Sequence, residues 1–435
     1  MTYKNFIFFL SKLKTNRLIT DSIWSLIGNV LGKGLTLLAG IIIARLLQKE
    51  TFGEYGIIRN TILTISVFST FGLGYTATKF VSEYKNSDPE KLNLFIKYST
   101  SVTLFFSSLM AIGLFIFAET ISINFLDSDT LILPLRILSV LIIFNAVSTT
   151  QIGILAGFGK FKELTRINSI IGVITFLLSI IFTYYWNLNG AIFSLLVVQI
   201  LNCIMNFLEV RKCITIKKEF NNTDKSLLKK IITFSTPIAL QELTYSAGSW
   251  ISNILLVKFS NYGELGIYSA AMQWYAILLF IPGILRNVVL SHLSEQVNDI
   301  NAHRKILKQT VIVNIICTLI PCFIVFIFSG IISNSYGRSF DGVGLIISIA
   351  AFTAIFSSVN NVFAQAYTSK GKNWTMLFFR FFSDMSTLAT FVILVNYTKL
   401  KGALSLVVSN LTLAIILTIV IVLYYIKAEK KYTIS

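Results

Sequence analysis

Long apolar runs separated by short polar stretches dominate the chain. A membrane-spanning helix needs about 20 mostly apolar residues, because its backbone must satisfy its own hydrogen bonds in lipid. Twelve such runs predict spans at residues 22–45, 55–76, 95–117, 131–155, 167–186, 190–208, 231–257, 266–289, 309–329, 343–366, 375–396 and 402–426. The longest connection, 209–230, is too short for a soluble domain of ordinary size. We therefore expect an all-α integral membrane protein.

The first 21 residues do not have the pattern of a signal peptide. Their apolar run, Phe6–Leu10, is too short, and no small-residue cleavage site follows it. Basic residues flank the run on both sides. We interpret residues 1–21 as a cytoplasmic interfacial segment that leads into the first span.

The composition excludes an ordinary soluble protein. Of 435 residues, 54% are hydrophobic and 13% are charged, against roughly 25% charged in a typical soluble domain. The net charge of +17 is unevenly distributed: the N-terminus and the even-numbered connections carry 26 of the 37 Lys and Arg residues, and the odd-numbered connections carry six. The positive-inside rule then places both termini, including a tail at 427–435, in the cytoplasm. Most of the basic excess serves orientation and contact with anionic lipids, so nucleic acid is not an expected partner.

Three short motifs recur in the two halves of the chain at nearly one offset. They are Phe52–Ile57 and Tyr262–Ile267, Gly159–Lys160 and Gly371–Lys372, and Leu188–Ala191 and Leu400–Ala403. This duplication predicts an N-lobe (22–208) and a C-lobe (231–426) of six helices each, joined by a basic cytoplasmic linker (209–230). Because each lobe has an even number of spans, both lobes begin on the same side of the membrane and are parallel repeats. Such an arrangement places a substrate path between the lobes. Helices 1 and 2, with their counterparts 7 and 8, are the candidates for lining it.

Five basic residues and two acidic residues fall within the predicted spans. They are Lys33, Arg59, Arg136, Arg286 and Arg380, with Glu242 and Asp384. A charge at the bilayer centre costs about 2.5 to 3.5 kcal/mol on insertion scales, so it usually faces a wet cavity or an opposite charge. Lys33 and Glu242 both lie near the midplane, at about 1.5 Å of rise per helical residue.

These charges have more than one interpretation. Lys33 is a candidate for binding an anionic head group, and Glu242 and Asp384 are candidates for carrying a coupling proton or cation. A fixed ion pair between Lys33 and Glu242, and a local Arg380–Asp384 pair, are the structural alternatives. Arg59 and Arg286 are cavity candidates that could equally extend to the lipid head groups, as Arg136 could.

Polar and aromatic side chains cluster in helices 7 and 8. Gln241, Tyr245, Gln273 and Trp274 belong to this cluster, and aromatic rings beside amides suit sugar faces and hydroxyls. The alternative is the aromatic belt that many membrane proteins place at the interface.

No pattern of catalytic or metal-binding residues is present in the sequence. The two histidines, His292 and His303, share one loop without metal-ligand spacing, and the four cysteines form no Cys-x-x-Cys pair. Asp127–Asp129 is an Asp-x-Asp, as some membrane glycosyltransferases use, but the large external segments of those enzymes are missing. We expect a protein that is not an enzyme and has neither cofactor nor metal.

Three stretches resemble one family. Ala44–Leu47 followed by Phe52–Gly56 is similar to the "ARLLGPxxFGxY" stretch of polysaccharide biosynthesis proteins, with Gln48 and Lys49 in place of Gly-Pro. The stretch from Gly72 to Glu83 resembles their "GLG…RFVSE", and Leu155–Phe161 resembles "LxGxGRF". This family belongs to the multidrug, oligosaccharidyl-lipid and polysaccharide exporter (MOP) superfamily.

The resemblance implies a MATE-like fold and a flippase of the bacterial cytoplasmic (inner) membrane. Its substrate would be an undecaprenyl-diphosphate-linked oligosaccharide, the repeat unit of O-antigen or capsule, moved by alternating access, with other polysaccharide-assembly proteins as partners. A drug exporter of the same superfamily is the alternative, although a cationic drug would prefer an acidic cavity and the spans carry a net charge of +3. The major facilitator class lacks support because its Asp-Arg-Gly-Arg-type loop is missing from 77–94. A membrane glycosyltransferase or polymerase is the alternative from a different class.

Overall fold

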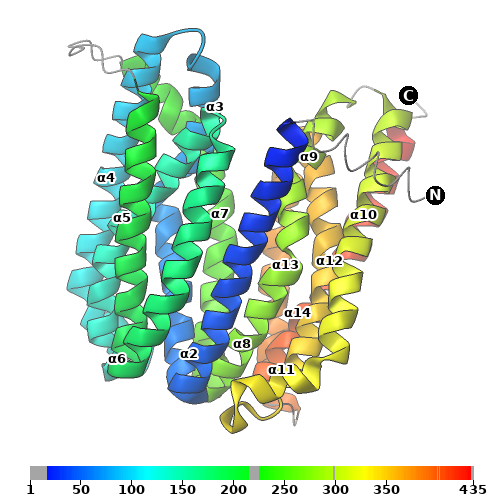
Figure 1. Cartoon of the computed structure of the whole chain (residues 1–435). Coiled ribbons are helices and arrows are strands. Elements are labelled where there is room, and N and C mark those ends of the chain that lie inside the picture. Colours follow the sequence, from blue (N-terminus) through cyan, green and yellow to red (C-terminus); the bar gives the residue numbers. More distant parts are fainter. Residues whose placement is uncertain (1–16, 215–224, 297–298, 399, 401, 433–435) are drawn as a thin grey trace, which may run out of the picture. The chain divides into compact units, whose positions relative to one another are not determined.

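Helices account for nearly all of the computed structural model, which describes residues 17–214, 225–296, 299–398, 400 and 402–432 (Figure 1). The long helices are α2 (Arg17–Thr70), α4 (Pro89–Thr120), α5 (Ile132–Gly157), α6 (Phe161–Cys213), α7 (Lys225–Phe259), α10 (Ile300–Ile327), α12 (Val343–Ser369), α13 (Asn373–Tyr397) and α14 (Gly402–Tyr432). The shorter ones are α3 (Leu73–Tyr84), α8 (Tyr262–Leu278), α9 (Phe280–Glu295) and α11 (Ser329–Tyr336). No described residue lies in a strand, which confirms the all-α prediction. Most of the interfacial segment, part of the linker and the end of the tail lie outside the described residues.

Seven helices of the described chain are long and apolar enough to cross a membrane. The pair Gly32–Thr70 and Leu73–Tyr84, bent by 43°, adds an eighth if it counts as one span. The two longest helices contain non-helical residues, at Gln48 in α2 and at Trp186 and Asn187 in α6. The break in α6 falls between the predicted spans 167–186 and 190–208. The total of twelve spans stays a prediction.

The chain divides into two compact units that are not contiguous in sequence. The first unit comprises the described residues up to Ala39 together with Thr61–Leu243, and the second comprises Gly40–Asn60 together with the described residues from Thr244 onwards. The end of the first predicted span and the start of the second therefore pack with the C-terminal helices, and the first half of α7 packs with the N-terminal helices. The predicted lobe boundaries, drawn from the repeat, describe a different division.

In the first unit, α5 is the central helix and contacts α3, α4 and α6. A buried apolar cluster joins α3, α4 and α5 to the start of α7, where Ile231 is fully buried. Thr76 of α3 and Ser235 of α7, both fully buried, share a hydrogen bond of 2.7 Å. Because lipid tails are as apolar as the helix surfaces, close packing and such polar contacts are what hold helices together in a membrane.

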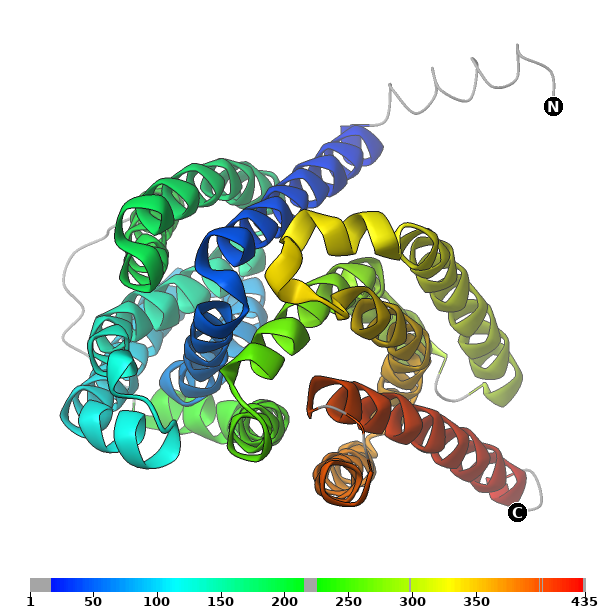
Figure 2. The ribbon, with the colours of Figure 1, turned by 90° about the horizontal axis from the view of Figure 1, so that it is seen from below.

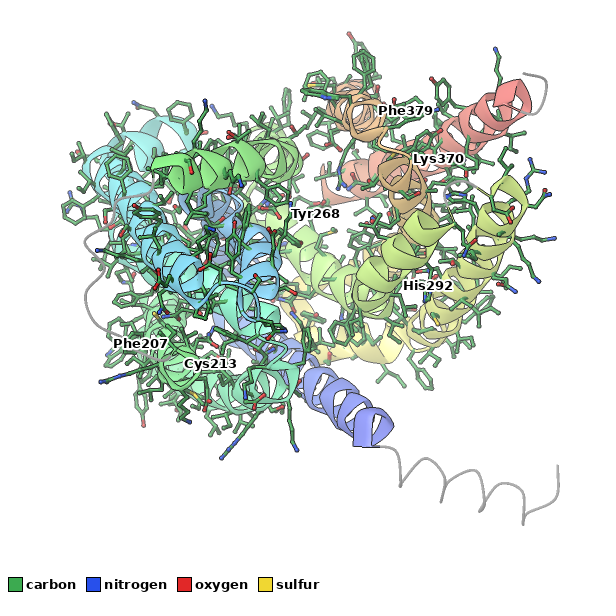
Figure 3. The ribbon with its side chains drawn as sticks, turned by 90° about the horizontal axis from the view of Figure 1, so that it is seen from above. Phe207, Cys213, Tyr268, His292, Lys370 and Phe379 are labelled. Carbon is green, nitrogen blue, oxygen red and sulfur yellow. The ribbon has the colours of Figure 1, made fainter. Side chains whose placement is uncertain are left out.

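In the second unit, the central helix is α12, which contacts α8, α9, α10, α13 and α14 (Figure 2). It is the counterpart of α5 in the duplicated chain. Asn360 donates to the carbonyl of Ala414 on α14 at 3.3 Å. Lys370, which is labelled in Figure 3, follows the last residue of α12. It donates a hydrogen bond of 2.8 Å to the Tyr425 hydroxyl, and the same hydroxyl contacts Nδ1 of the buried His303 at 3.1 Å. His303 is thus part of a hydrogen-bonded network that fixes helix ends.

The repeated motifs of the sequence are contact points of the second unit. A Cβ atom built on Gly53 would overlap the carbonyl oxygen of Tyr262, and one built on Gly266 would overlap the carbonyl oxygen of Lys49. The two copies of the motif therefore pack against each other, and the backbone of each copy contacts the backbone at or near the other. Glu264 accepts a hydrogen bond of 2.9 Å from the backbone N–H of Ala403, at the start of α14. Two of the duplicated landmarks are thus joined directly.

Candidate functional site

Lys33 is exposed on α2, within the first unit. Its neighbour Gly32 lies against α6, where a Cβ built on Gly172 would come 2.9 Å from the Cα of Gly32. Successive helical residues are separated by about 100°, so the Gly32 contact fixes this stretch of α2 while the lysine stays on an open side of the helix. Lys33 is thus an exposed basic residue about halfway along a predicted span.

Arg59 is exposed in the second unit, on the part of α2 that follows Gln48. Its guanidinium lies 5.8 Å from the centre of the Tyr55 ring, within cation–π range. The next residue, Asn60, donates to the Ser249 hydroxyl on α7 at 3.2 Å. The arginine is therefore presented from a segment that is held to α7.

The two acidic candidates are both half-buried. Glu242 lies on α7, at the end of the part that belongs to the first unit. Asp384 lies on α13, and its Oδ2 atom is buried without a hydrogen-bond partner among the described residues. Gly248 on α7 allows the close approach, because a Cβ there would stand 3.4 Å from that oxygen. A buried carboxylate oxygen without a donor favours a bound proton or cation.

The candidates on α8 differ in what their polar groups contact. Gln273 packs its amide against Gly40 of α2, and its Oε1 atom is buried without a partner in the described chain. Trp274 donates its indole N–H to the hydroxyl of the fully buried Tyr336 at 3.0 Å. The Trp274 ring therefore ties α8 to the end of α11, a packing role. Gln241, Tyr245 and Arg286 lie on α7 and α9, and their side chains are outside the described part of the structure.

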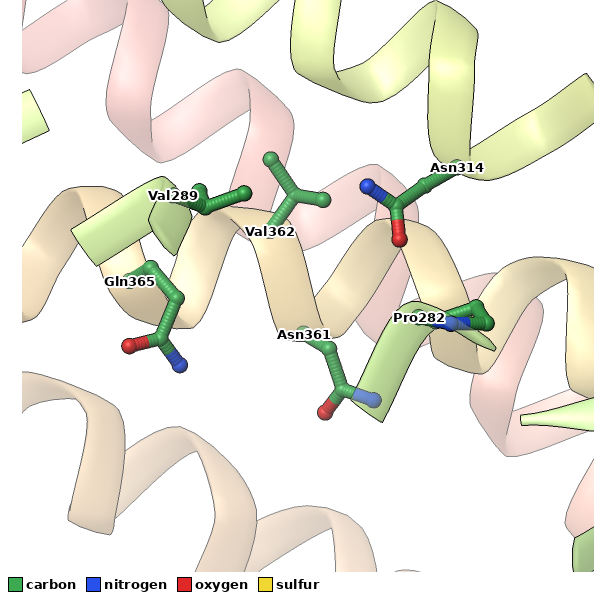
Figure 4. Close-up of a pocket in the computed structure, with 6 residues that line it drawn as sticks. All are labelled: Pro282, Val289, Asn314, Asn361, Val362 and Gln365. Atoms are coloured by element: carbon green, nitrogen blue, oxygen red, sulfur yellow. The ribbon is translucent and has the colours of Figure 1, made fainter. Parts of the chain in front are cut away.

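A small pocket in the second unit is lined by residues that the sequence analysis did not single out. Asn314 of α10 and Asn361 and Gln365 of α12 surround it, together with Pro282, Val289 and Val362 (Figure 4). Three amides inside predicted spans are a signal visible in the sequence. These amides were not among the candidates, because those were chosen by charge and from the seventh and eighth predicted spans.

The structure thus holds three kinds of polar group in its spans: exposed cations, half-buried carboxylates and a set of amides. Lys33 and Glu242 belong to the first unit, and Arg59, Gln273 and Asp384 belong to the second. That these residues serve one substrate path stays a prediction. The cations suit an anionic group, the carboxylates suit a coupling ion, and the amides suit a hydroxyl-rich group.

Comparison with known proteins gives one matching family model, that of the polysaccharide biosynthesis proteins, which matches residues 18–290. An uncharacterized membrane protein of Methanocaldococcus jannaschii is 24% identical over 421 residues, covering 92% of this chain and 96% of the relative. That relative supports a membrane protein and says nothing of a substrate.

Solved structures share the fold. The inward-facing form of a MATE-family multidrug resistance transporter of the MOP superfamily superposes with a TM-score of 0.77 at 15% identity, covering 94% of this chain and 99% of the other. The lipid II flippase MurJ in its inward closed conformation gives a TM-score of 0.73 at 17% identity, covering 94% of this chain and 87% of the other. The predicted MATE-like fold is confirmed.

Proposed function

The chain belongs to the polysaccharide biosynthesis protein family, and from this premise we propose that it translocates an undecaprenyl-diphosphate-linked oligosaccharide across the cytoplasmic membrane. The oligosaccharide is the repeat unit of O-antigen or capsule, and the transport cycle is alternating access around a cavity between two lobes. The lipid tail stays in the bilayer while the diphosphate and the sugars cross through the protein. The chain is a transporter of the MOP fold, and no chemical bond of the substrate needs to change.

The observation that carries this proposal is the exposure of Lys33 within a span. An ammonium exposed to lipid at this depth is unfavourable by several kcal/mol, whereas a water-filled cavity removes most of that cost. A diphosphate is the complementary ligand, because charge-assisted hydrogen bonds to its oxygens are about twice as strong as neutral ones. Arg59, also exposed, is a cation of the second unit with the same preference for phosphate oxygens.

The carboxylates provide a route for energy coupling. Asp384 has an unpartnered buried oxygen, and Glu242 lies near the residue at which α7 passes from one unit to the other. Binding a proton or a monovalent cation at either group would change its charge during the cycle. Such a change favours one conformation over another by the difference in ion affinity between them.

A drug exporter of the same superfamily is less consistent with these side chains. Organic cations favour an acidic cavity, whereas five basic and two acidic residues lie in the predicted spans. A glycosyltransferase or polymerase needs catalytic groups, and the sequence shows neither a pattern of such residues nor the large external segments of the membrane glycosyltransferases. Glycan transfer by the purified protein would support that enzyme class instead.

Deletion of the gene tests the proposal in the cell. We expect lipid-linked oligosaccharide to accumulate on the cytoplasmic side and surface glycan to fall, as measured by mass spectrometry of the lipid fraction and by glycan staining. Complementation with the wild-type gene should restore both. Unchanged intermediates together with normal surface glycan would contradict the proposed function.

A further inference from the structure

The amide-lined pocket of the second unit is formed where one helix is interrupted. One residue, Leu279, separates α8, which ends at Leu278, from α9, which begins at Phe280. Pro282 then prevents the usual bond to the carbonyl of Leu278, because proline has no N–H. Interrupted helices in transporters commonly mark binding sites, since they expose backbone and side-chain polar groups at membrane depth.

Two amides of α12 point toward the same side of that helix (Figure 4). Asn361 and Gln365 are four residues apart, so they lie one above the other on one face. Gln365 is only 5% exposed, whereas Asn361 is exposed, and both side chains line the pocket. An amide offers two donors and an acceptor, so this pair is suited to a polar ligand.

The third amide closes the pocket from α10. Asn314 is 2% exposed and donates to its own helix at the carbonyl of Thr310, 3.0 Å away. Its side chain extends toward Pro282 (Figure 4). The remaining lining is apolar, from Val289 and Val362. No charged residue lines the pocket.

The depth of the pocket indicates that it opens to water. Asn361 lies eight residues before the end of α12, about 12 Å along the helix axis. Its side chain is exposed, and an amide exposed to hydrocarbon would leave its donors and acceptor unsatisfied. A wet cavity satisfies them.

The size of the pocket limits the ligand group. It has a volume of about 10 Å³, close to what one water molecule requires. A hydroxyl group occupies the same space and, like water, both donates and accepts hydrogen bonds. A diphosphate is too large and would lack a cation, and an alkyl tail would leave the amides unpaired.

We propose that this pocket is a sugar-recognition subsite, in which the side chains of Asn361 and Gln365 bind one hydroxyl or acetamido group of the transported oligosaccharide. The inference rests on the proposed function, because it names the part of that substrate that the second unit recognises. The neutral amides select the sugar, and the diphosphate binds elsewhere, at a cation.

The test compares sugar binding by purified full-length protein in nanodiscs. Saturation-transfer NMR with methyl glycosides of glucose, galactose and N-acetylglucosamine reports weak sugar contacts, and line broadening of inorganic pyrophosphate in phosphorus NMR reports anion binding. The test variant is Asn361→Leu with Gln365→Met, which keeps side-chain volume and removes both amides. Thr368→Val is the matched control on the same helix, because the Thr368 hydroxyl only bonds its own backbone at Ala364, 2.8 Å away.

We expect at least one glycoside to bind the wild type and the control equally. The double variant should bind it at least fivefold more weakly, since each neutral hydrogen bond contributes a factor of about two to ten. Pyrophosphate binding should be unchanged in the double variant. Absence of glycoside binding by the wild type, or equal binding by the folded double variant, would overturn the subsite.

Failure of the proposed function is a separate outcome. It is measured as translocation of lipid-linked oligosaccharide by the wild type in proteoliposomes. Wild-type protein that translocates this substrate, combined with a double variant that translocates and binds sugars equally well, refutes the subsite alone. Wild-type protein that translocates nothing refutes the function.

Discussion

Replacing Gly53 by alanine should separate the two copies of the duplicated motif. A Cβ at position 53 overlaps the carbonyl oxygen of Tyr262 and stands 2.8 Å from its carbonyl carbon. Favourable carbon–carbon contacts are about 3.5 to 4.0 Å, so the two backbones must move apart by about 1 Å. Overpacking of this kind costs about 1 to 3 kcal/mol. Gly266→Ala should cost a similar amount, because the Cβ there meets the carbonyl of Lys49 in the same way.

The assay is thermal unfolding of purified protein in detergent, with Gly113→Ala as the control. Gly113 lies within α4 and has nothing within 4 Å of its Cβ position, so alanine there should be neutral or stabilising by up to about 1 kcal/mol. We expect the double variant at 53 and 266 to lose less stability than the two single losses added together, because either substitution already separates the backbones. Wild-type stability of Gly53→Ala, or losses that simply add, would refute this packing.

Three further predictions follow from other residues. Gln48 has φ 64° and ψ 171°, a conformation that essentially only glycine adopts without strain. Gln48→Gly should therefore raise the stability of the protein by about 1 kcal/mol in the same unfolding assay. A lower melting temperature of this variant would count against strain at Gln48. Lys33→Ala should abolish export of lipid-linked oligosaccharide at normal protein level while Lys33→Arg retains part of it, and full export by the alanine variant would remove Lys33 from the site. Asp384→Asn or Glu242→Gln should make translocation in vesicles insensitive to an imposed proton or sodium gradient, and a gradient dependence retained by both variants would exclude these carboxylates from coupling.

The helical architecture was largely accessible from sequence because lipid imposes a strong rule on backbone hydrogen bonding. The break at Trp186 and Asn187 illustrates this: it falls where two apolar runs had been separated by a few polar residues. The division into units was not accessible. It depends on contacts between distant segments, such as the bond between Thr76 and Ser235, which apolar periodicity does not encode.

The duplicated motif was recognised as a repeat, but its role became clear only from the structure. Gly53 and Gly266 are close contacts of one copy with the other, and a single sequence contains no information on which repeats touch. Gln48 is a related case. It replaces the glycine of the family stretch, and the structure gives it the backbone conformation that favours glycine.

The candidate site was predicted unevenly. Charges within spans are rare and costly, so Lys33 and Asp384 could be selected as candidates from sequence alone, and their roles stay predictions. Trp274 was selected for its chemistry, whereas its indole N–H bonds a buried tyrosine. Asn361 and Gln365 were passed over because uncharged amides are common in polytopic helices, and only the pocket that they share distinguishes them.

Reconstituted translocation tests the central claim most directly. Purified protein is placed in proteoliposomes containing an undecaprenyl-diphosphate-linked oligosaccharide, and its arrival in the outer leaflet is followed by accessibility to an added glycan-modifying enzyme. We predict protein-dependent translocation by the wild type and loss of it in Lys33→Ala. A rate equal to that of protein-free liposomes, from wild-type protein shown to be folded, would contradict the account.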